Sequence, residues 1–585
     1  MKRHLLAAMI SLVMLQTACS YKESSSQATV SPAPAAEMMS QDKPNIAETK
    51  DNQAAVISSS KLEKTAEVYQ VQTAKKAMMV KERAVHRSLM AGNIAMSPPV
   101  AMMDTMAMPR DERDKFEHFK DNPIKQVATD PVSTFSLDVD TGSYALVRQF
   151  IQQGRLPAAD AVRTEELINY FSYDYPKAMA EHPFAVETEL SSAPWQPEHY
   201  LLRIGVQAQD IQAKEMPPAN LVFLVDVSGS MNEANKLPLV ISSLQMLTQQ
   251  LRPQDRVSLV VYAGRTEVVL EPTNNKADIL AALGRLQAGG STAGTSALDL
   301  AYKMARKAYI KEGINRILLA TDGDFNVGIT STEQIKDMVK RERETGITLS
   351  TLGFGQGNFN DAMMEQIANV GNGNYSYIDS LTEARKVLID ELSSTFNTVA
   401  KDVKVQIEFN PDWVSEYRLI GYENRQLQRE DFNNDKVDAG DVGAGKSVTA
   451  IYEITPKSAS ASVDALRYQT MPEAAKTKSK PVGSELAFLK IRYKKPNADK
   501  SILITQPIIA PKTVNAFDKA SENQRFASAV AGFGQLLRQS PQMGHLSYQQ
   551  VLQIAQQAKT KDNTGVKGEF IQLVKNAQAL AGKAE

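Results

Sequence analysis

The chain has 585 residues, and its 66 lysines and arginines nearly balance 67 aspartates and glutamates, for a formal net charge of −1. This length exceeds what one hydrophobic core organises, so two to four domains are expected. With 43% hydrophobic and 23% charged residues, the composition is that of a globular protein. The balanced charge excludes the large basic excess that neutralises nucleic-acid phosphates.

Residues 1–18 are predicted to be a signal peptide. Lys2 and Arg3 supply its positive start, and Leu5 to Leu15 form an apolar stretch too short to span a bilayer comfortably. Small residues then lead to Cys19, the only cysteine in the chain. This ending resembles a bacterial lipobox, except that Gln16 stands where the pattern usually has an apolar residue.

The lipobox resemblance implies cleavage and lipidation at Cys19. Several acyl chains, palmitate among them, anchor a protein more durably than one. Ser20 after the cysteine resembles the outer-membrane sorting pattern. A membrane contact through this anchor is therefore expected in the bacterial envelope, facing the periplasm rather than the cell surface. The alternative is an ordinary cleaved signal with an incidental cysteine.

Residues 19–115 are predicted to form a disordered tether. They are rich in Ser, Ala, Gln, Lys, Pro and Met and have no sustained apolar periodicity. Such a segment cannot bury enough apolar surface to offset the entropy lost on ordering.

Residues 118–209 are predicted to form a small α+β companion domain. The stretch "STFSLDVD" alternates as a strand does. The stretches "SYALVRQFIQQG" and "AVRTEELINYF" have helical spacing, and the Pro217-Pro218 pair marks the break that follows.

Residues 217–397 repeat strand–helix units. Apolar strands such as "LVFLVDV", "RVSLVVYA" and "RILLATD" alternate with amphipathic helices such as "SALDLAYKMARKAY" and "TEQIKDMVKRERE". This alternation predicts a doubly wound, mostly parallel α/β sheet. Residues 400–585 begin as strands and finish as helices from Gln524 to about Ala581, so they are expected to form a second α+β domain.

Oxygen-bearing side chains follow the strands of the α/β region. Asp226, Ser228 and Ser230 leave the first strand, and Asp322 follows "RILLAT" directly. The loop "AGGSTAG" adds Thr292, with Ser291 as an alternative. Loops at the carboxyl ends of parallel strands share one edge of the sheet. Two carboxylates and three hydroxyls there suit Mg²⁺ or Mn²⁺ better than Ca²⁺.

These residues bring the chain to a known family. The pattern D-x-S-x-S, a later Thr and a later T-D-G resemble the metal-ion-dependent adhesion site of von Willebrand factor type A domains. The match covers Asp226, Ser228, Ser230, Thr292 and Asp322. Residues 133–171 resemble the companion domain of bacterial envelope members, and the part after Phe396 resembles their C-terminal domain, so the resemblance runs from about residue 118 to the end.

The resemblance implies a Rossmann-like fold and a mechanism of partner capture. The five side chains would hold most of the metal shell, and an exposed Asp or Glu of a protein partner would complete it. The chain is then expected to be a binding module and not an enzyme. The alternative is a structural scaffold of the envelope, in which the metal only stiffens one loop.

Two further motifs have a local explanation. Gly440 to Ser447, "GDVGAGKS", fits the P-loop pattern, but a working P-loop follows a strand and opens a helix, whereas this one precedes a β pattern. A glycine-rich turn is predicted there, and no nucleotide. The stretch "DVDTGS" resembles half of an aspartic protease site, and its Asp138 and Asp140 are expected to fix a local turn.

Overall fold

The computed structural model describes residues 114–582, except 138–139, 180, 291–294, 324–331, 465–483 and 560. All of them belong to one unit of the chain, Asp104–Glu585. The signal peptide, the tether and Cys19 lie outside the described residues. No helix within the described part of the chain is long and apolar enough to cross a membrane.

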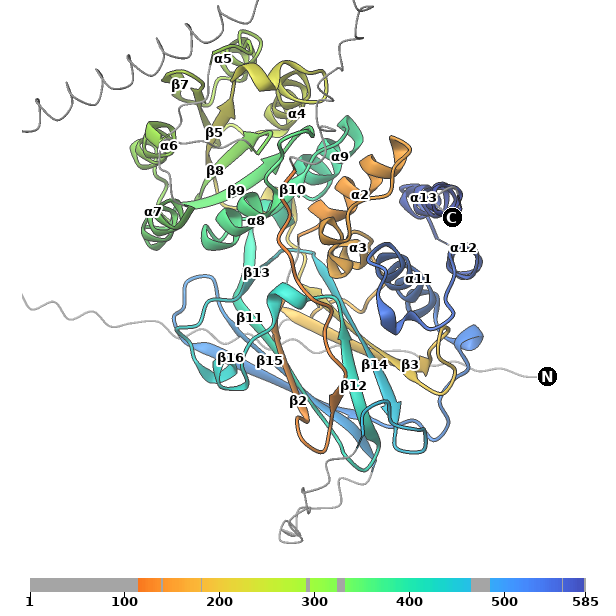
Figure 1. Cartoon of the computed structure of the whole chain (residues 1–585). Coiled ribbons are helices and arrows are strands. Elements are labelled where there is room, and N and C mark those ends of the chain that lie inside the picture. The colour runs from red at the N-terminus through yellow and green to blue at the C-terminus, as the bar shows by residue number, and fades with distance from the viewer. Residues whose placement is uncertain are drawn as a thin grey trace, which may run out of the picture. The chain divides into compact units, whose positions relative to one another are not determined.

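The central α/β domain is built on a six-stranded sheet of order β10-β9-β8-β5-β6-β7 (Figure 1). Its strands pair in parallel except β7, an antiparallel edge strand that the sequence pattern did not reveal. Strand β5 is buried along its whole length, as its unbroken apolar run requires. The predicted mostly parallel, doubly wound sheet is confirmed. The strands are β5 Ala219–Asp226, β6 Arg256–Tyr262, β7 Thr266–Thr273, β8 Ile314–Thr321, β9 Thr348–Gly353 and β10 Tyr375–Tyr377.

Helices cover both faces of this sheet and bury an apolar cluster on each. One cluster includes Val240 of α4, Ile279 of α5 and Ala384 of α9. The other includes Leu298 of α6 and Val339 of α7. The helices are α4 Leu237–Gln250, α5 Lys276–Leu283, α6 Thr295–Lys307, α7 Thr332–Glu344, α8 Asp361–Val370, α9 Leu381–Arg385 and α10 Leu392–Phe396, with a π-helical turn over Lys386–Asp390.

The segments before and after the α/β domain share two antiparallel sheets. One sheet has the order β1-β12-β14-β4-β3, and the other has the order β13-β11-β15-β16 with β2 paired to β11. In Figure 1 the early strands β2 and β3 accordingly lie among later, blue-green strands. The strands are β1 Lys125–Gln126, β2 Val132–Ser136, β3 Phe184–Ser192, β4 Tyr200–Ala208, β11 Thr398–Phe409, β12 Val414–Ile420, β13 Gly440–Gly443, β14 Ser447–Pro456, β15 Glu485–Lys494 and β16 Ser501–Ile509.

The pairing of β4 with β14 shows how far this sharing extends along the chain. Ile204 is opposite Ala450, and the register runs from Tyr200 to Gln207 without a shift. The α/β domain is therefore inserted between two halves of one structure. Inward-facing residues of both sheets form a single apolar cluster, which includes Ile204, Ile407 and Leu489.

A helical layer packs beside these sheets and also combines both halves of the chain. Phe171 lies edge-to-face against Phe526 at 5.0 Å and against Phe570 at 5.5 Å between ring centroids. Figure 1 shows the orange helices α2 and α3 next to the dark blue helices α11 to α13. The helices are α2 Gly142–Gln152, α3 Thr164–Asn169, α11 Glu522–Leu537, α12 Tyr548–Gln557 and α13 Val566–Ala581.

The two motifs with a local explanation had different outcomes. The stretch 440–447 forms β13, a turn and the start of β14, so the predicted turn is confirmed. Asp140 also makes tertiary contacts that the prediction of a local turn did not include. Its Oδ1 accepts the Tyr375 N–H at 2.9 Å, and its Oδ2 lies 3.5 Å from the Arg425 guanidinium. Asp138 lies outside the described residues.

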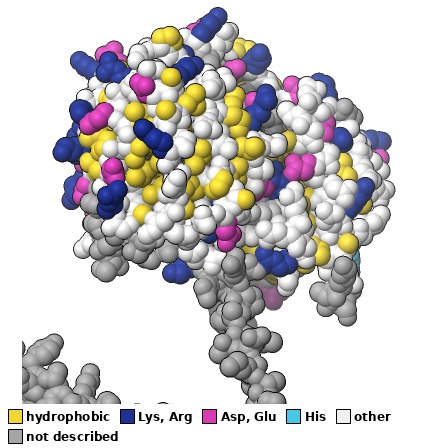
Figure 2. Space-filling model, turned by 90° about the horizontal axis from the view of Figure 1, so that it is seen from above, with side chains coloured by type: hydrophobic (Ala, Val, Ile, Leu, Met, Phe, Trp, Pro, Cys, Tyr) yellow, Lys and Arg dark blue, Asp and Glu magenta, His cyan; other side chains and the backbone are white. Residues whose placement is uncertain are grey.

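Figure 2 looks down on the molecule of Figure 1 and shows basic and acidic side chains interspersed around the margin of this face. Apolar side chains are scattered across its middle. Neither sign of charge dominates this face, which agrees with the near-zero net charge of the chain.

Candidate metal centre

Asp226 and Asp322 lie at the carboxyl ends of neighbouring parallel strands. Asp226 ends β5, and Asp322 follows β8, with Val225 opposite Ala320 in the register. Strand β8 pairs with one edge of β5 and strand β6 pairs with the other edge. The chain therefore extends the sheet in opposite directions from β5. Open α/β sheets bind ligands at such switch points. The fold thus brings two predicted ligands to the expected edge.

The loop after β5 is organised around the Asp226 carboxylate. Its Oδ1 accepts the Ser228 N–H at 2.8 Å, and its Oδ2 accepts the Thr321 hydroxyl at 3.0 Å. The hydroxyl oxygens of Ser228 and Ser230 are 3.0 Å apart. The structure therefore brings these two predicted hydroxyl ligands together beside the carboxylate, and it adds Thr321 as a residue that orients Asp226.

Both carboxylates are removed from water. Asp226 is 0% exposed and Asp322 is 1% exposed. Burial raises the pKa of Asp226 to about 6; hydrogen bonds from Ser228 oppose this rise, and the negative charge of Asp322 adds to it. Because burial penalises the ionised form of Asp226, a cation bound beside it would stabilise that form.

The donor set fits a small divalent cation. It consists of hard carboxylate and hydroxyl oxygens, which Mg²⁺ and Mn²⁺ prefer. Within the described ranges, no group of three or more His, Cys, Asp or Glu side chains is placed to hold a metal ion. Among the described residues at these strand ends the predicted set has two carboxylates, so hydroxyls would have to supply its remaining protein ligands.

The loop that leads to Thr292, the remaining predicted ligand, approaches the loop after β5. Thr292 and its alternative Ser291 lie outside the described residues. The residues just before them are placed: Gly290 O accepts the Gly229 N–H at 3.0 Å, and Gly289 N–H donates to Val227 O at 2.8 Å. The loop that leads to Thr292 is therefore hydrogen-bonded to the serine loop.

Lys236 is a component of the site that sequence reasoning missed. Its Nζ lies 2.9 Å from Asp322 Oδ2, and the side chains are 4% and 0% exposed. The residue comes directly before α4, ten positions after Asp226. Its partner is 86 residues away in the chain, so no local pattern signals the pair.

A loop of residues 354–360 connects this edge to the first described residues of the chain. Gly323, with φ +87°, lies so near this loop that a Cβ would be 2.3 Å from Asn360 N. The Asp114 Oδ1 accepts the N–H groups of Gly357 and Phe359 at 2.9 and 2.8 Å. The end of the predicted tether is thus fastened one loop away from Asp322.

Family models match nearly all of the described chain. The model described as "von Willebrand factor type A domain" matches residues 220–391. The model described as "von Willebrand factor" matches 110–203, and "Uncharacterized protein YfbK, C-terminal" matches 394–580. The uncharacterized protein YfbK of Escherichia coli (strain K12) is 52% identical over 476 residues, which cover 80% of this chain and 81% of that protein. The chain belongs to the YfbK family.

More distant similarities are restricted to parts of the chain or to the fold. The inter-alpha-trypsin inhibitor heavy chain H3 of Homo sapiens is 24% identical over 270 residues, which cover 42% of this chain and 29% of that protein. A solved von Willebrand factor type A structure from Catenulispora acidiphila is 14% identical and covers 66% of this chain and 88% of that chain, with a TM-score of 0.38. The type A assignment of the YfbK family member therefore rests on the family models.

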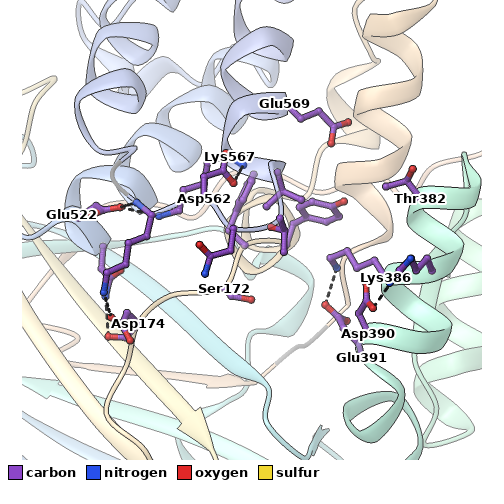
Figure 3. Close-up of a pocket in the computed structure, with 18 of the residues that line it drawn as sticks. Ser172, Asp174, Thr382, Lys386, Asp390, Glu391, Glu522, Asp562, Lys567 and Glu569 are labelled. Atoms are coloured by element: carbon purple, nitrogen blue, oxygen red, sulfur yellow. Dashed lines mark hydrogen bonds and ion pairs between the residues drawn. The ribbon is translucent and has the colours of Figure 1, made fainter.

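A cavity of about 750 Å³ lies where the companion segment, the end of the type A domain and the C-terminal helices meet (Figure 3). Its charged groups are paired: Lys386 with Glu391 at 2.9 Å and Lys567 with Glu522 at 3.1 Å. The Lys386 ammonium also lies 4.2 Å from the centre of the Tyr170 ring. None of the predicted metal ligands lines this cavity, so it belongs to the contact between regions and not to the metal centre.

Proposed function

We propose that this protein is a divalent-cation-dependent binding module of the bacterial envelope. Two buried carboxylates, Asp226 and Asp322, and the adjacent hydroxyls of Ser228 and Ser230 support this proposal. They would hold Mg²⁺ or Mn²⁺ together with Thr292. The bound cation supplies an electrophilic position that an oxygen ligand from outside can complete.

The partner would be a protein that presents an exposed Asp or Glu. Burial of Asp226 makes its charge costly without a cation, and the small number of carboxylates in the predicted set would leave a loaded site able to attract a further anion. Residues 1–20 support anchoring in the outer membrane through lipid at Cys19, facing the periplasm. The protein would thus hold its partner near that membrane and catalyse no reaction.

The test is partner capture from envelope extracts with the full chain and its Asp226→Ala variant. In buffer with Mg²⁺, we expect capture by the natural chain and its loss in the variant, with unchanged circular dichroism. Chelation by EDTA should abolish capture by the natural chain. Equal capture by both proteins would contradict binding through the metal.

A structural scaffold is the second candidate, and the sharing of strands favours it. Strands β1 to β4 pair with strands from the C-terminal half, so the flanking regions form an extensive structure of their own. In that case the flanking regions would carry the assembly and the metal would only stabilise a loop. Capture that survives both Asp226→Ala and EDTA would favour this candidate.

A further inference from the structure

Lys236 brings a positive charge directly to the candidate metal centre. Its ammonium nitrogen is 2.9 Å from Asp322 Oδ2, and Lys236 as a whole is 3% exposed. A buried ammonium needs a charged or polar partner, because its desolvation is costly. The lysine and the aspartate therefore satisfy each other in the absence of metal.

The position of Lys236 is unfavourable for a lysine by local criteria. It precedes the first residue of α4, a position where Ser, Thr, Asp or Asn side chains cap the helix, and no side-chain cap is made. The positive end of the helix dipole lies at the same terminus. The stabilising contact comes from Asp322 across the strand ends, so the placement depends on the site.

The lysine stem is fixed as well as its charge. It crosses Gly355, where a Cβ would lie 2.5 Å from Lys236 Cε and 2.6 Å from Cγ. Gly355 has φ +71°, and its carbonyl accepts the Tyr377 hydroxyl at 2.6 Å. Because Gly355 has no side chain, it leaves space for the buried lysine stem that extends to Asp322.

We infer that Lys236 is a specificity-determining residue that lowers the affinity of the centre for cations and raises the affinity of the loaded centre for carboxylates. This inference rests on the proposed function. A fixed positive charge beside Asp322 repels an incoming divalent cation. Once the cation is bound, the same charge attracts an anionic ligand to it. The site would then bind its metal modestly and select acidic partners.

The inference is tested with Lys236→Met, which keeps the stem and removes the charge. The matched control is Lys307→Met, because Lys307 pairs on the surface with Glu271 and both side chains are more than half exposed. Mn²⁺ is titrated calorimetrically into each full-length protein. Acetate is then added to the Mn²⁺-saturated proteins, and its binding is followed by the Mn²⁺ electron paramagnetic resonance signal.

The expected changes have opposite signs. Lys236→Met should bind Mn²⁺ about tenfold more tightly than the natural chain, since two unit charges a few ångströms apart interact by several RT near a protein surface. It should bind acetate at least threefold more weakly. Lys307→Met should stay within twofold of the natural chain in both titrations.

The metal-free proteins give a readout that does not depend on ligand capture. Lys236→Met leaves Asp322 buried without its ammonium, so its thermal midpoint should fall, and saturating Mn²⁺ should restore it. A variant that remains unfolded at saturating Mn²⁺ overturns the inference. Equal Mn²⁺ affinity in variant and natural chain also overturns it while the proposed function stands. Binding of Mn²⁺ by neither protein overturns both.

Discussion

Among the regions of the molecule that bury carboxylates, two differ in how those charges are matched. At the contact between the companion segment and the type A domain, Arg163 lies among Glu166, Asp361 and Glu365. At the strand ends, Asp226 accepts hydrogen bonds from the Ser228 N–H and the Thr321 hydroxyl, which are neutral donors. In the first region the positive charge is that of Arg163. In the second region Lys236 is paired with Asp322 and not with Asp226.

This difference distinguishes a structural contact from the proposed binding site. The Arg163 guanidinium donates to both Asp361 oxygens, at 2.5 and 3.2 Å, and to Glu166. Such fork-like pairing satisfies charge and geometry together. At Asp226, by contrast, burial raises the pKa of the carboxyl because it penalises the ionised form. The comparison predicts that disturbing the first region changes stability, while disturbing the second changes ligand binding.

The largest stability effect is expected from Arg163→Met. Removing the guanidinium leaves several carboxylates buried without their partner, which costs about 3–5 kcal/mol of unfolding free energy. Arg265→Met is the control, because the Arg265–Glu267 pair is exposed and contributes about 0–1 kcal/mol. Thermal unfolding of both variants checks this prediction. Equal losses would contradict the structural role of the Arg163 cluster.

A pH-dependent effect of intermediate size is expected from Asp441, which lies near further carboxylates. Burial raises the pKa of Asp441 to about 7; the Asp402 N–H opposes this rise, and the charges of Asp402 and Asp438 add to it. The unfolded value is about 3.9. The folded chain therefore binds more protons between about pH 4 and 7, and stability falls as pH rises through this window.

Asp441→Asn removes this titration while its side-chain oxygen can still accept the Asp402 N–H, which is 3.2 Å from Asp441 Oδ1. The variant should be about 1–3 kcal/mol more stable than the natural chain above pH 7 and equal to it near pH 4. Urea unfolding at several pH values measures the difference. A difference that does not depend on pH would contradict the assignment to Asp441.

The smallest effect is expected at Asp114. Replacing it with alanine removes its two hydrogen bonds to the amides of Gly357 and Phe359, each of which contributes about 1 kcal/mol. Hydrogen exchange at these two amides should accelerate, with little change in global stability. Unchanged exchange would show that the start of the described chain does not hold this loop in solution.

Local patterns in the sequence were enough for the parallel strands of the type A sheet, though not for its edge strand β7, and for the position of Asp226 and Asp322 at strand ends. The apolar run of β5 ends at Asp226, and alternation then places Ser228 and Ser230 in one short loop. The strand ending at Thr321 likewise presents Asp322. Strand ends and their loops are local features, so they could be predicted from spacing and composition.

Contacts between distant segments could not be predicted in this way. Asp140 looks like a turn residue, yet its Tyr375 partner is 235 positions away. Lys236 has the acidic Glu233 three positions earlier, yet its ammonium pairs with Asp322, 86 positions away. The joining of β4 to β14 likewise depends on the tertiary pairing of two strands that lie far apart in the sequence. Periodicity identifies such strands but does not say which partner each one takes.

The most direct test of the account is calorimetric titration of Mg²⁺, Mn²⁺ and Ca²⁺ into the full-length natural chain and into its Asp226→Ala and Asp322→Ala variants. We expect saturable binding of Mg²⁺ or Mn²⁺ to the natural chain, weaker binding of Ca²⁺, and at least a hundredfold loss of affinity in each variant, because each removes a carboxylate ligand. Metal binding of equal strength in the natural chain and both variants would contradict a metal centre at these strand ends.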